Sequence, residues 1–343
     1  MDLLPWRLIG VGAVGAALAG WAAAQRFDRA KIEADPNHQA LFTALDAPHR
    51  EVTASDGTRL AARSFGPADA PTIVFAHGWT CSDEFWKLQV ESLRRHRRIV
   101  LYDQRGHGKS GRAAGGDYSI EAFGRDLDSV LDAFVPVGEK ALLVGHSLGA
   151  MTIAAWAKDN PEVGNRASGA VLCNTGVGDL ISESLVVEGI PHRLDRLQRI
   201  VGEAILRARA PIPSFSAPIS YRLIGYAVVG PCATPAQIAF CERLVLECPP
   251  GVRASVGGTL SKLDLCAGLA GLSVPTLLIC GECDRLTPPV HAAQMAAKLP
   301  NLVELIEIER SGHMGPIEFP DRFNSLIEEM ARSSSVAEVL VAA

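Results

Sequence analysis

The chain has 343 residues, of which 48% are hydrophobic and 21% are charged, and its formal net charge is −5. This composition is typical of a globular protein with a large core, and the length fits one domain with an insertion better than two equal domains. The mild acidity gives no support for nucleic-acid binding. No Walker loop, dinucleotide-binding fingerprint or zinc-ligand spacing is present, which removes the common nucleotide-dependent and zinc-dependent classes.

Residues 1–24 form an apolar N-terminal segment. Its uncharged run from Leu8 to Ala24 is at the short limit for crossing a bilayer, and Trp6 and Trp21 lie near the ends, where interfacial anchors are found. The run predicts a membrane anchor and a membrane-associated protein. Two alternatives stay open. One is a secretory signal cleaved after Ala24, which would make the protein secreted, and the other is a peripheral apolar helix.

The next part of the chain predicts an α/β domain. Residues 25–47 are interpreted as a polar linker and 48–332 as the domain. A hairpin with an Asp56-Gly57 turn opens it, and strands then alternate with helical stretches. That alternation indicates a doubly wound, mostly parallel sheet. The strands expected after the hairpin are 72–76, 98–102, 140–145, 169–174, 275–280 and 303–308.

The stretch Gly145-His146-Ser147-Leu148-Gly149 follows a buried strand and precedes a helical stretch. This arrangement predicts a nucleophile elbow, in which a serine on a strained strand-to-helix turn presents its Oγ above the sheet. The two glycines are expected because strain and close helix–strand approach leave no room for a Cβ on either side of the serine. Ser147 is the predicted nucleophile.

An elbow serine is followed along the chain by an acid and then a histidine. Asp284 lies at the end of strand 275–280, and His313 follows strand 303–308. Because functional groups in open α/β sheets gather at the carboxyl ends of strands, Ser147, Asp284 and His313 are predicted to meet there. Glu282 is a rival acid, which alternation along an extended stretch would point away from Asp284.

The oxyanion hole of this arrangement uses two backbone N–H groups, and losing one donor typically raises the barrier by about 3 kcal/mol. One donor is the residue after the nucleophile, Leu148. The other lies in the loop after strand 72–76, where His77-Gly78-Trp79 supplies Trp79. His77, His107 and His146 lie in glycine turns and are expected to be structural.

Between the sixth and seventh strands the alternation stops, and residues 178–270 read as a helical lid broken by prolines. Its first helix, 191–208, is expected to have an apolar face that lines an acyl pocket. Residues 333–343 are expected to form a flexible tail.

The eight cysteines leave their redox state open. Cys280-x-x-Cys283 resembles a redox pair, but Cys280 ends an apolar strand, where free cysteine is a common small hydrophobe. A disulfide among Cys232, Cys241 and Cys248 is conceivable only in an exported protein.

Five motifs in order resemble the α/β-hydrolase fold family and cover nearly all of the chain: His77-Gly78-Trp79, Asp103–Ser110, Gly145–Gly149, Gly281–Asp284 and Gly312–Met314. The resemblance implies an α/β-hydrolase fold with a Ser147–Asp284–His313 triad. It also implies that Asp103–Ser110 shapes the floor of the site, with Asp103 and Arg105 as a structural ion pair or loop brace. The serine at position 147 excludes the dehalogenases and epoxide hydrolases of the family, which use an aspartate there.

The sequence therefore predicts a serine esterase or lipase that cleaves carboxylic esters with an apolar acyl group through an acyl-enzyme on Ser147. It needs no cofactor or metal. Its expected partners are a small ester or lipid substrate and, through residues 1–24, a membrane. Cofactor-free haloperoxidase or perhydrolase chemistry and carbon–carbon bond or amide hydrolysis remain alternatives on the same triad. A catalytically dead binding protein is the alternative outside enzymes.

Overall fold

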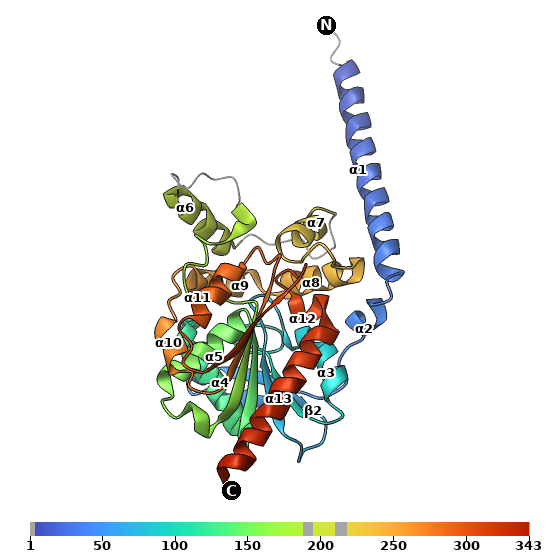
Figure 1. The fold of residues 1–343 in the computed structure, drawn as a ribbon. Helices are drawn as coiled ribbons and strands as arrows, with labels where there is room; N and C mark the ends of the chain where they lie inside the picture. Colours follow the sequence, from blue (N-terminus) through green and yellow to red (C-terminus); the bar gives the residue numbers. More distant parts are fainter. Residues whose placement is uncertain (1–3, 188–194, 210–217, 343) are drawn as a thin grey trace.

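The computed structural model describes residues 4–187, 195–209 and 218–342. One eight-stranded sheet, in the order β1-β2-β4-β3-β5-β6-β7-β8, forms the centre of the domain (Figure 1). The strands are β1 (Arg50–Thr53), β2 (Arg59–Phe65), β3 (Thr72–Ala76), β4 (Arg98–Tyr102), β5 (Ala141–His146), β6 (Ala167–Cys173), β7 (Thr276–Gly281) and β8 (Leu302–Ile308).

Strands β3 to β8 pair in parallel, whereas β1 and β2 form the predicted antiparallel hairpin at one edge. Gly57 in the hairpin turn has φ +87°, a conformation that glycine adopts without steric cost. The parallel strands β3, β5, β6 and β7 are buried and rich in apolar residues, because helices cover both faces of the sheet there. The predicted doubly wound α/β fold is confirmed.

Helices form a layer on each face of the sheet, and apolar side chains fill the two spaces between (Figure 1). The first layer contains α4 (Ile120–Phe134), α5 (Leu148–Asp159), α10 (Cys266–Gly271) and α11 (Pro289–Ala296). The second contains α3 (Lys87–Leu93), α12 (Gly315–Glu318) and α13 (Pro320–Ala342). Helix α13 continues through the segment that was expected to be a flexible tail.

A helical insert joins β6 to β7, where the strand–helix alternation of the sequence stops. Its helices are α6 (Asp195–Leu206), α7 (Pro218–Ala227), α8 (Pro235–Glu247), α9 (Pro250–Leu260) and α10. Helix α8 begins with a capping box, in which Thr234 and Gln237 each bond the other's backbone N–H, and Pro235 occupies its first position. Helix α6 corresponds to the predicted helix 191–208, but residues 191–194 of that prediction lie outside the described residues.

The N-terminal helix α1 (Leu4–Glu33) extends away from the domain and is followed by α2 (His38–Phe42) (Figure 1). Its C-terminal part packs against α7 and α8, and Asp28 Oδ2 lies 2.9 Å from Arg222 Nη1. Two residues after the end of α1, Asp35 accepts the N–H of Ala236 at 2.9 Å. The end of α1 is thus tied to the insert.

The membrane prediction for residues 1–24 is wrong. No helix in the described part of the chain combines the length and apolar composition needed to cross a bilayer. Much of the run from Leu8 to Ala24 is alanine and glycine, whose small side chains contribute little apolar surface, and the run was already short for a span. Helix α1 continues past Ala24 without a break.

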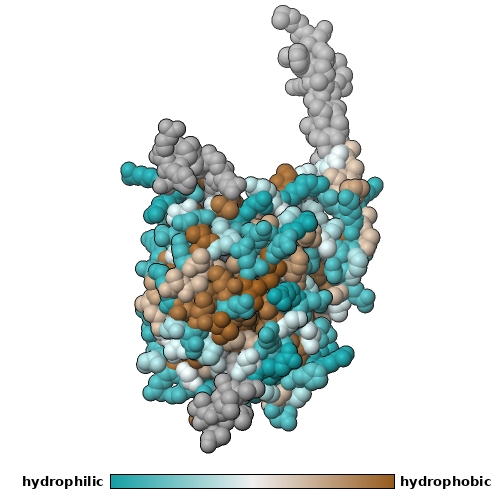
Figure 2. All heavy atoms as spheres, in the orientation of Figure 1, coloured by the Kyte–Doolittle hydropathy of each residue, from teal (hydrophilic) through white to brown (hydrophobic). Residues whose placement is uncertain are grey.

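Figure 2 shows hydrophobic side chains gathered in the middle of one face of the molecule, with hydrophilic ones around them. Strand β8 is an edge of the sheet, and its Val303 is 57% exposed. The exposed Glu304 and Glu307 of the same strand place charges along this edge, which disfavours pairing with another chain.

Candidate active site

Ser147 stands on the sharp turn between β5 and α5. Its φ of 51° and ψ of −117° are strained for a residue with a Cβ. Its N–H donates to the carbonyl of Cys173 at 3.0 Å, and its carbonyl accepts the hydroxyl of Thr175 at 3.0 Å. These bonds to the end of β6 hold the strained turn in place.

Steric constraints require glycine on either side of the turn. A Cβ on Gly145 would lie 2.5 Å from the N atom of Ala150, and one on Gly149 would overlap the carbonyl of Ala76 at the end of β3. Helix α5 can therefore start close to the sheet only because both positions lack a side chain. This is the local geometry that the sequence motif predicts.

Asp284 and His313 meet at the carboxyl ends of β7 and β8. Nδ1 of His313 lies 2.8 Å from Oδ2 of Asp284, and both side chains are buried. This contact puts the ring proton on Nδ1 and makes Nε2 the basic nitrogen of the ring. The elbow is tied to the same loop, because His146 Nε2 lies 2.8 Å from the carbonyl oxygen of His313 and the two rings are 5.0 Å apart.

Two neighbours of Asp284 were not found from the sequence. Thr287 donates its N–H to Oδ1 and its hydroxyl to Oδ2, both at 2.9 Å, and Asn174 donates its amide to Oδ2 at 3.2 Å. Burial alone would raise the pKa of Asp284, but the nearby His313 and the bonds from Thr287 lower it below its usual value. Asp284 is thus a carboxylate with a fixed orientation.

The rival acid Glu282 lies elsewhere. Its side chain is exposed, and Oε2 accepts the N–H of Arg310 at 2.8 Å. Asp284 is thus directed to His313 and Glu282 to the surface, and the turn that follows Gly281 separates them, not an alternation along a strand, which would put positions 282 and 284 on the same face.

The loop after β3 borders Ser147. A Cβ on Gly78 would lie 3.3 Å from the Cβ of Ser147 and 2.6 Å from the ring of His146, so only glycine allows the approach. Among the described residues no acceptor meets the backbone N–H of Trp79 or that of Leu148. The Trp79 indole donates to the carbonyl of Arg253 on α9 at 3.2 Å, which fixes this loop against the insert.

Ser147 and His313 open into a cavity of about 280 Å³. Its walls are almost entirely apolar, and most of them belong to the insert and to the segment before it. The apolar wall residues include Leu180, Ile181, Val186, Ile205, Leu206, Ile224, Val228, Val245, Leu260 and Leu286. A volume near the lower end of ligand pockets, with a mostly apolar lining that also includes Ser147 and His313, suits a small or medium-sized apolar ligand.

The three other histidines near the site are structural, as expected. Nδ1 of His77 bonds the carbonyl of Gly78 at 2.8 Å, and that of His107 bonds the carbonyl of Arg105 at 3.1 Å. Burial lowers the pKa of His77 to about 4 and those of His107 and His146 to about 3. These rings are neutral at physiological pH.

Asp103 and Arg105 do not pair with each other, although an ion pair was one expectation. Arg105 forms a bidentate pair with Asp126 and also contacts Asp56 at 2.9 Å. Asp103 instead accepts the N–H groups of Asp83 and Lys109, each at 2.7 Å. Both residues brace the loop, which is the other expectation.

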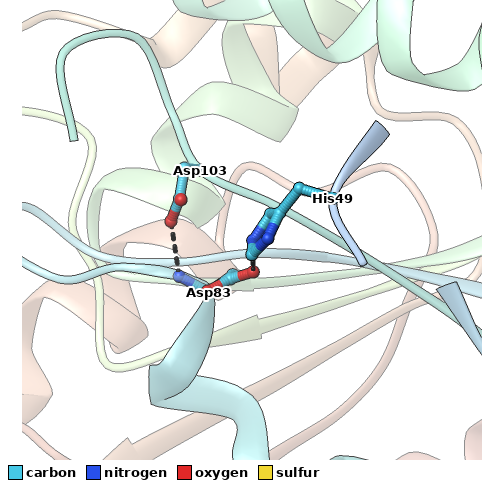
Figure 3. A group of neighbouring side chains, drawn as sticks. All are labelled: His49, Asp83 and Asp103. Atoms are coloured by element: carbon cyan, nitrogen blue, oxygen red, sulfur yellow. Dashed lines mark hydrogen bonds and ion pairs between the residues drawn. The ribbon is translucent and has the colours of Figure 1, made fainter. Parts of the chain in front are cut away.

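His49, Asp83 and Asp103 form the group of possible metal ligands in the described part of the chain, with donor atoms within 4.8 Å of one another (Figure 3). The nitrogen and oxygen atoms that could bind a metal already have protein partners. Asp83 lies 2.9 Å from His49 and pairs with the buried Arg63 at 2.7 Å, while Asp103 holds two backbone N–H groups. Because a cation here would compete with the guanidinium of Arg63, the cluster fits a structural brace better than a metal centre.

All eight cysteines carry free thiols. Cys241 and Cys248 are buried and Cys232 is exposed, so the disulfide considered among them is not formed. Cys280 is buried at the end of β7, in the core position that its apolar strand predicts.

Comparisons with known proteins agree with this architecture. The sequence profile of the alpha/beta hydrolase family matches residues 73–326. The chain is 27% identical over 286 residues to 3-oxoadipate enol-lactonase 1 of Acinetobacter baylyi, covering 82% of this chain and 96% of that protein. It is 25% identical over 252 residues to a non-heme chloroperoxidase of Burkholderia pyrrocinia, covering 72% of this chain and 87% of that protein.

Among solved structures, a thermophilic esterase from Thermogutta terrifontis superposes with a TM-score of 0.67 at 26% identity. The match covers 84% of this chain and 99% of the esterase. These relatives differ in the reactions that their names give. They therefore support the family of this chain but do not identify its substrate.

Proposed function

Because this chain belongs to the alpha/beta hydrolase family, we propose that it is a serine hydrolase that cleaves carboxylic esters with an apolar acyl group. The observation that carries the proposal is the pairing of His313 with Asp284 beside a strained Ser147, at the base of an apolar cavity. A serine nucleophile needs a base within reach and a group that orients the base, and in this proposal His313 and Asp284 take these two roles.

In the proposed reaction, Ser147 Oγ attacks the ester carbonyl carbon while His313 Nε2 takes its proton. The oxyanion accepts the N–H groups of Trp79 and Leu148, and Asp284 stabilises the imidazolium. The tetrahedral intermediate then expels the alcohol, which leaves with the proton from Nε2, and an acyl ester remains on Ser147. Water attacks this ester, gives its proton to Nε2, and the carboxylic acid departs as Ser147 regains its hydrogen.

The apolar wall supports an aliphatic or aromatic acyl group as the part of the substrate that is bound. Burying a methylene there contributes roughly 0.8 kcal/mol, so the affinity is expected to rise with acyl length until the cavity is full. The volume of about 280 Å³ favours short and medium chains over long ones.

Perhydrolysis is the second candidate, because one relative is a non-heme chloroperoxidase. On the same triad, hydrogen peroxide would replace water in attacking the acyl-enzyme and give a peracid. The two activities share the first half of the reaction and differ only in the second nucleophile.

The test is turnover of p-nitrophenyl esters from acetate to dodecanoate by the full chain, with fluorophosphonate labelling of Ser147 measured in parallel. We expect labelling and a rate maximum at a short or medium chain. Peracid formation in added peroxide that outpaces hydrolysis would favour the second candidate. Absence of labelling would overturn the serine mechanism.

A further inference from the structure

Glu318, on the short helix α12, carries a buried carboxylate for which the proposed reaction has no use. Its side chain is not at the surface, and its oxygens accept three backbone N–H groups. Oε2 accepts from Gly312 at 2.9 Å and from Gly230 at 2.8 Å, and Oε1 accepts from Met314 at 3.0 Å. Bonds to an ionised acceptor are stronger than those between neutral groups, so this arrangement is a firm backbone clamp.

Two of the three donors flank His313 directly. The third, Gly230, belongs to the segment of the insert that follows α7. This segment also holds the histidine itself, because the N–H of His313 donates to the carbonyl of Val228 at 2.9 Å. Val228 in turn lines the cavity at the base of which His313 lies.

The two glycines of the clamp pack backbone against backbone. A Cβ on Gly230 would lie 2.6 Å from the N atom of Gly312, and one on Gly312 would overlap the N atom of Gly230. With both side chains absent, one carboxylate can reach both N–H groups. The histidine loop and the cavity wall are thus joined at a single buried charge.

We propose that Glu318 is a positioning residue, which fixes the loop of His313 to the insert segment 228–230 and so holds the imidazole in the geometry for proton transfer. The inference rests on the proposed function, in which His313 moves the proton of Ser147. It differs from that function in assigning a second carboxylate, distinct from Asp284, that orients the histidine through its backbone and not through its ring.

The clamp depends on the charge state of Glu318. Burial, opposed by the three N–H bonds, raises the pKa of Glu318 to about 7. The titratable groups that interact with it are Asp284 from the loop after β7, Cys283 on that loop, and Cys241 from α8. Below this pH a proton on one oxygen would face backbone donors, and the clamp would loosen.

The test compares Glu318→Gln with Glu318→Asp and with Glu328→Gln as the matched control. Glutamine keeps the shape but replaces one acceptor oxygen by an NH₂ group, whereas aspartate keeps the carboxylate with a shorter reach. Glu328, on α13, makes an ion pair with Arg97 at 2.9 Å and none of the three clamp bonds. The full chain is assayed by the fluorophosphonate labelling rate, by kcat and KM for p-nitrophenyl butyrate from pH 5 to 9, and by melting temperature.

We expect Glu318→Gln to lower kcat and the labelling rate by about 10-fold to 100-fold, the usual cost of a small misplacement of a catalytic group, with little change in KM. The wild-type kcat should fall more steeply below pH 7 than the kcat of the glutamine variant, because only the wild type has a carboxylate at position 318 that takes up a proton there. Glu318→Asp should recover part of kcat, and Glu328→Gln should keep wild-type kcat.

Labelling and kcat of Glu318→Gln equal to wild type, with or without a lower melting temperature, would overturn this inference and leave the proposed function intact. Should the glutamine variant not fold, the same two readouts on Glu318→Asp and the slope of the wild-type pH profile decide. A wild-type protein that does not label at all removes the proposed function and this inference together.

Discussion

The two sides of the cavity are built differently. At its base, the strand ends bring Ser147, Asp284 and His313 together through short hydrogen bonds and backbone contacts that only glycine permits. Its wall consists of aliphatic side chains of the insert, and one of them, Ile205, is 59% exposed. The base leaves no space for change, whereas the wall can change in size without disturbing hydrogen bonds. Chemistry and substrate choice are therefore expected to respond to different substitutions.

The largest loss of activity is expected from a substitution at the base of the cavity, at the nucleophile. Ser147→Ala should lower kcat for ester hydrolysis by about 10⁶-fold, because removing a nucleophile from such a unit leaves only binding and oxyanion stabilisation. Melting temperature should not fall. Ser325→Ala, an exposed serine on α13, is the control and should behave as wild type. Activity of the purified alanine variant near that of wild type would remove Ser147 from the mechanism.

The next largest effect is expected at the acid. Asp284→Asn should reduce kcat by about 10⁴-fold, because an amide at this position favours the wrong tautomer of His313. Glu282→Gln, two residues away on the exposed side, should change kcat less than about twofold. Steady-state kinetics on both variants check the ranking, and the reverse order would assign the acid to Glu282.

A substitution in the wall should act on selectivity instead. Ile224→Trp on α7 places a larger side chain into the cavity and should lower kcat/KM for p-nitrophenyl octanoate by about 10-fold or more, while the acetate ester is affected much less. The ratio of the two values is the measurement. Equal losses on both esters would mean that the wall and the base are not independent.

The smallest effect concerns stability in acid. Because the pKa of Asp284 is lower in the folded protein than its usual value, its charged form stabilises the fold above about pH 4, and this contribution is lost as pH falls through the folded pKa. Asp284→Asn lacks this term. Urea unfolding at pH 7 and pH 3.5 should therefore show a smaller pH-dependent loss of unfolding free energy for the variant than for wild type. A larger loss for the variant would contradict the lowered pKa.

The features that the sequence predicts well are local. The strands follow from short runs of apolar residues, and the elbow follows from the two glycines that flank Ser147. Asn174 could not be found in this way, because it bonds an aspartate 110 positions along the chain and meets it only where β6 and β7 lie side by side. The same holds for Glu318 and Gly230, which are 88 positions apart.

The N-terminal prediction failed for a different reason. A run without charges is not necessarily apolar enough for a span, because one rich in alanine and glycine has little side-chain surface to bury. Of the two expectations for Asp103 and Arg105, the ion pair between them is not formed, because each residue is paired with partners from other loops and helices.

The attachment of α1 has a consequence for how the enzyme could be tuned. Asp28 and Asp35 fasten the helix to α7 and to the start of α8, and α7 contributes Ile224 to the cavity wall. The N-terminal helix is thereby linked to a helix that lines the cavity. Loss of the Asp28–Arg222 contact would therefore act first on α7 and the cavity wall, and not on the hydrogen bond between Asp284 and His313.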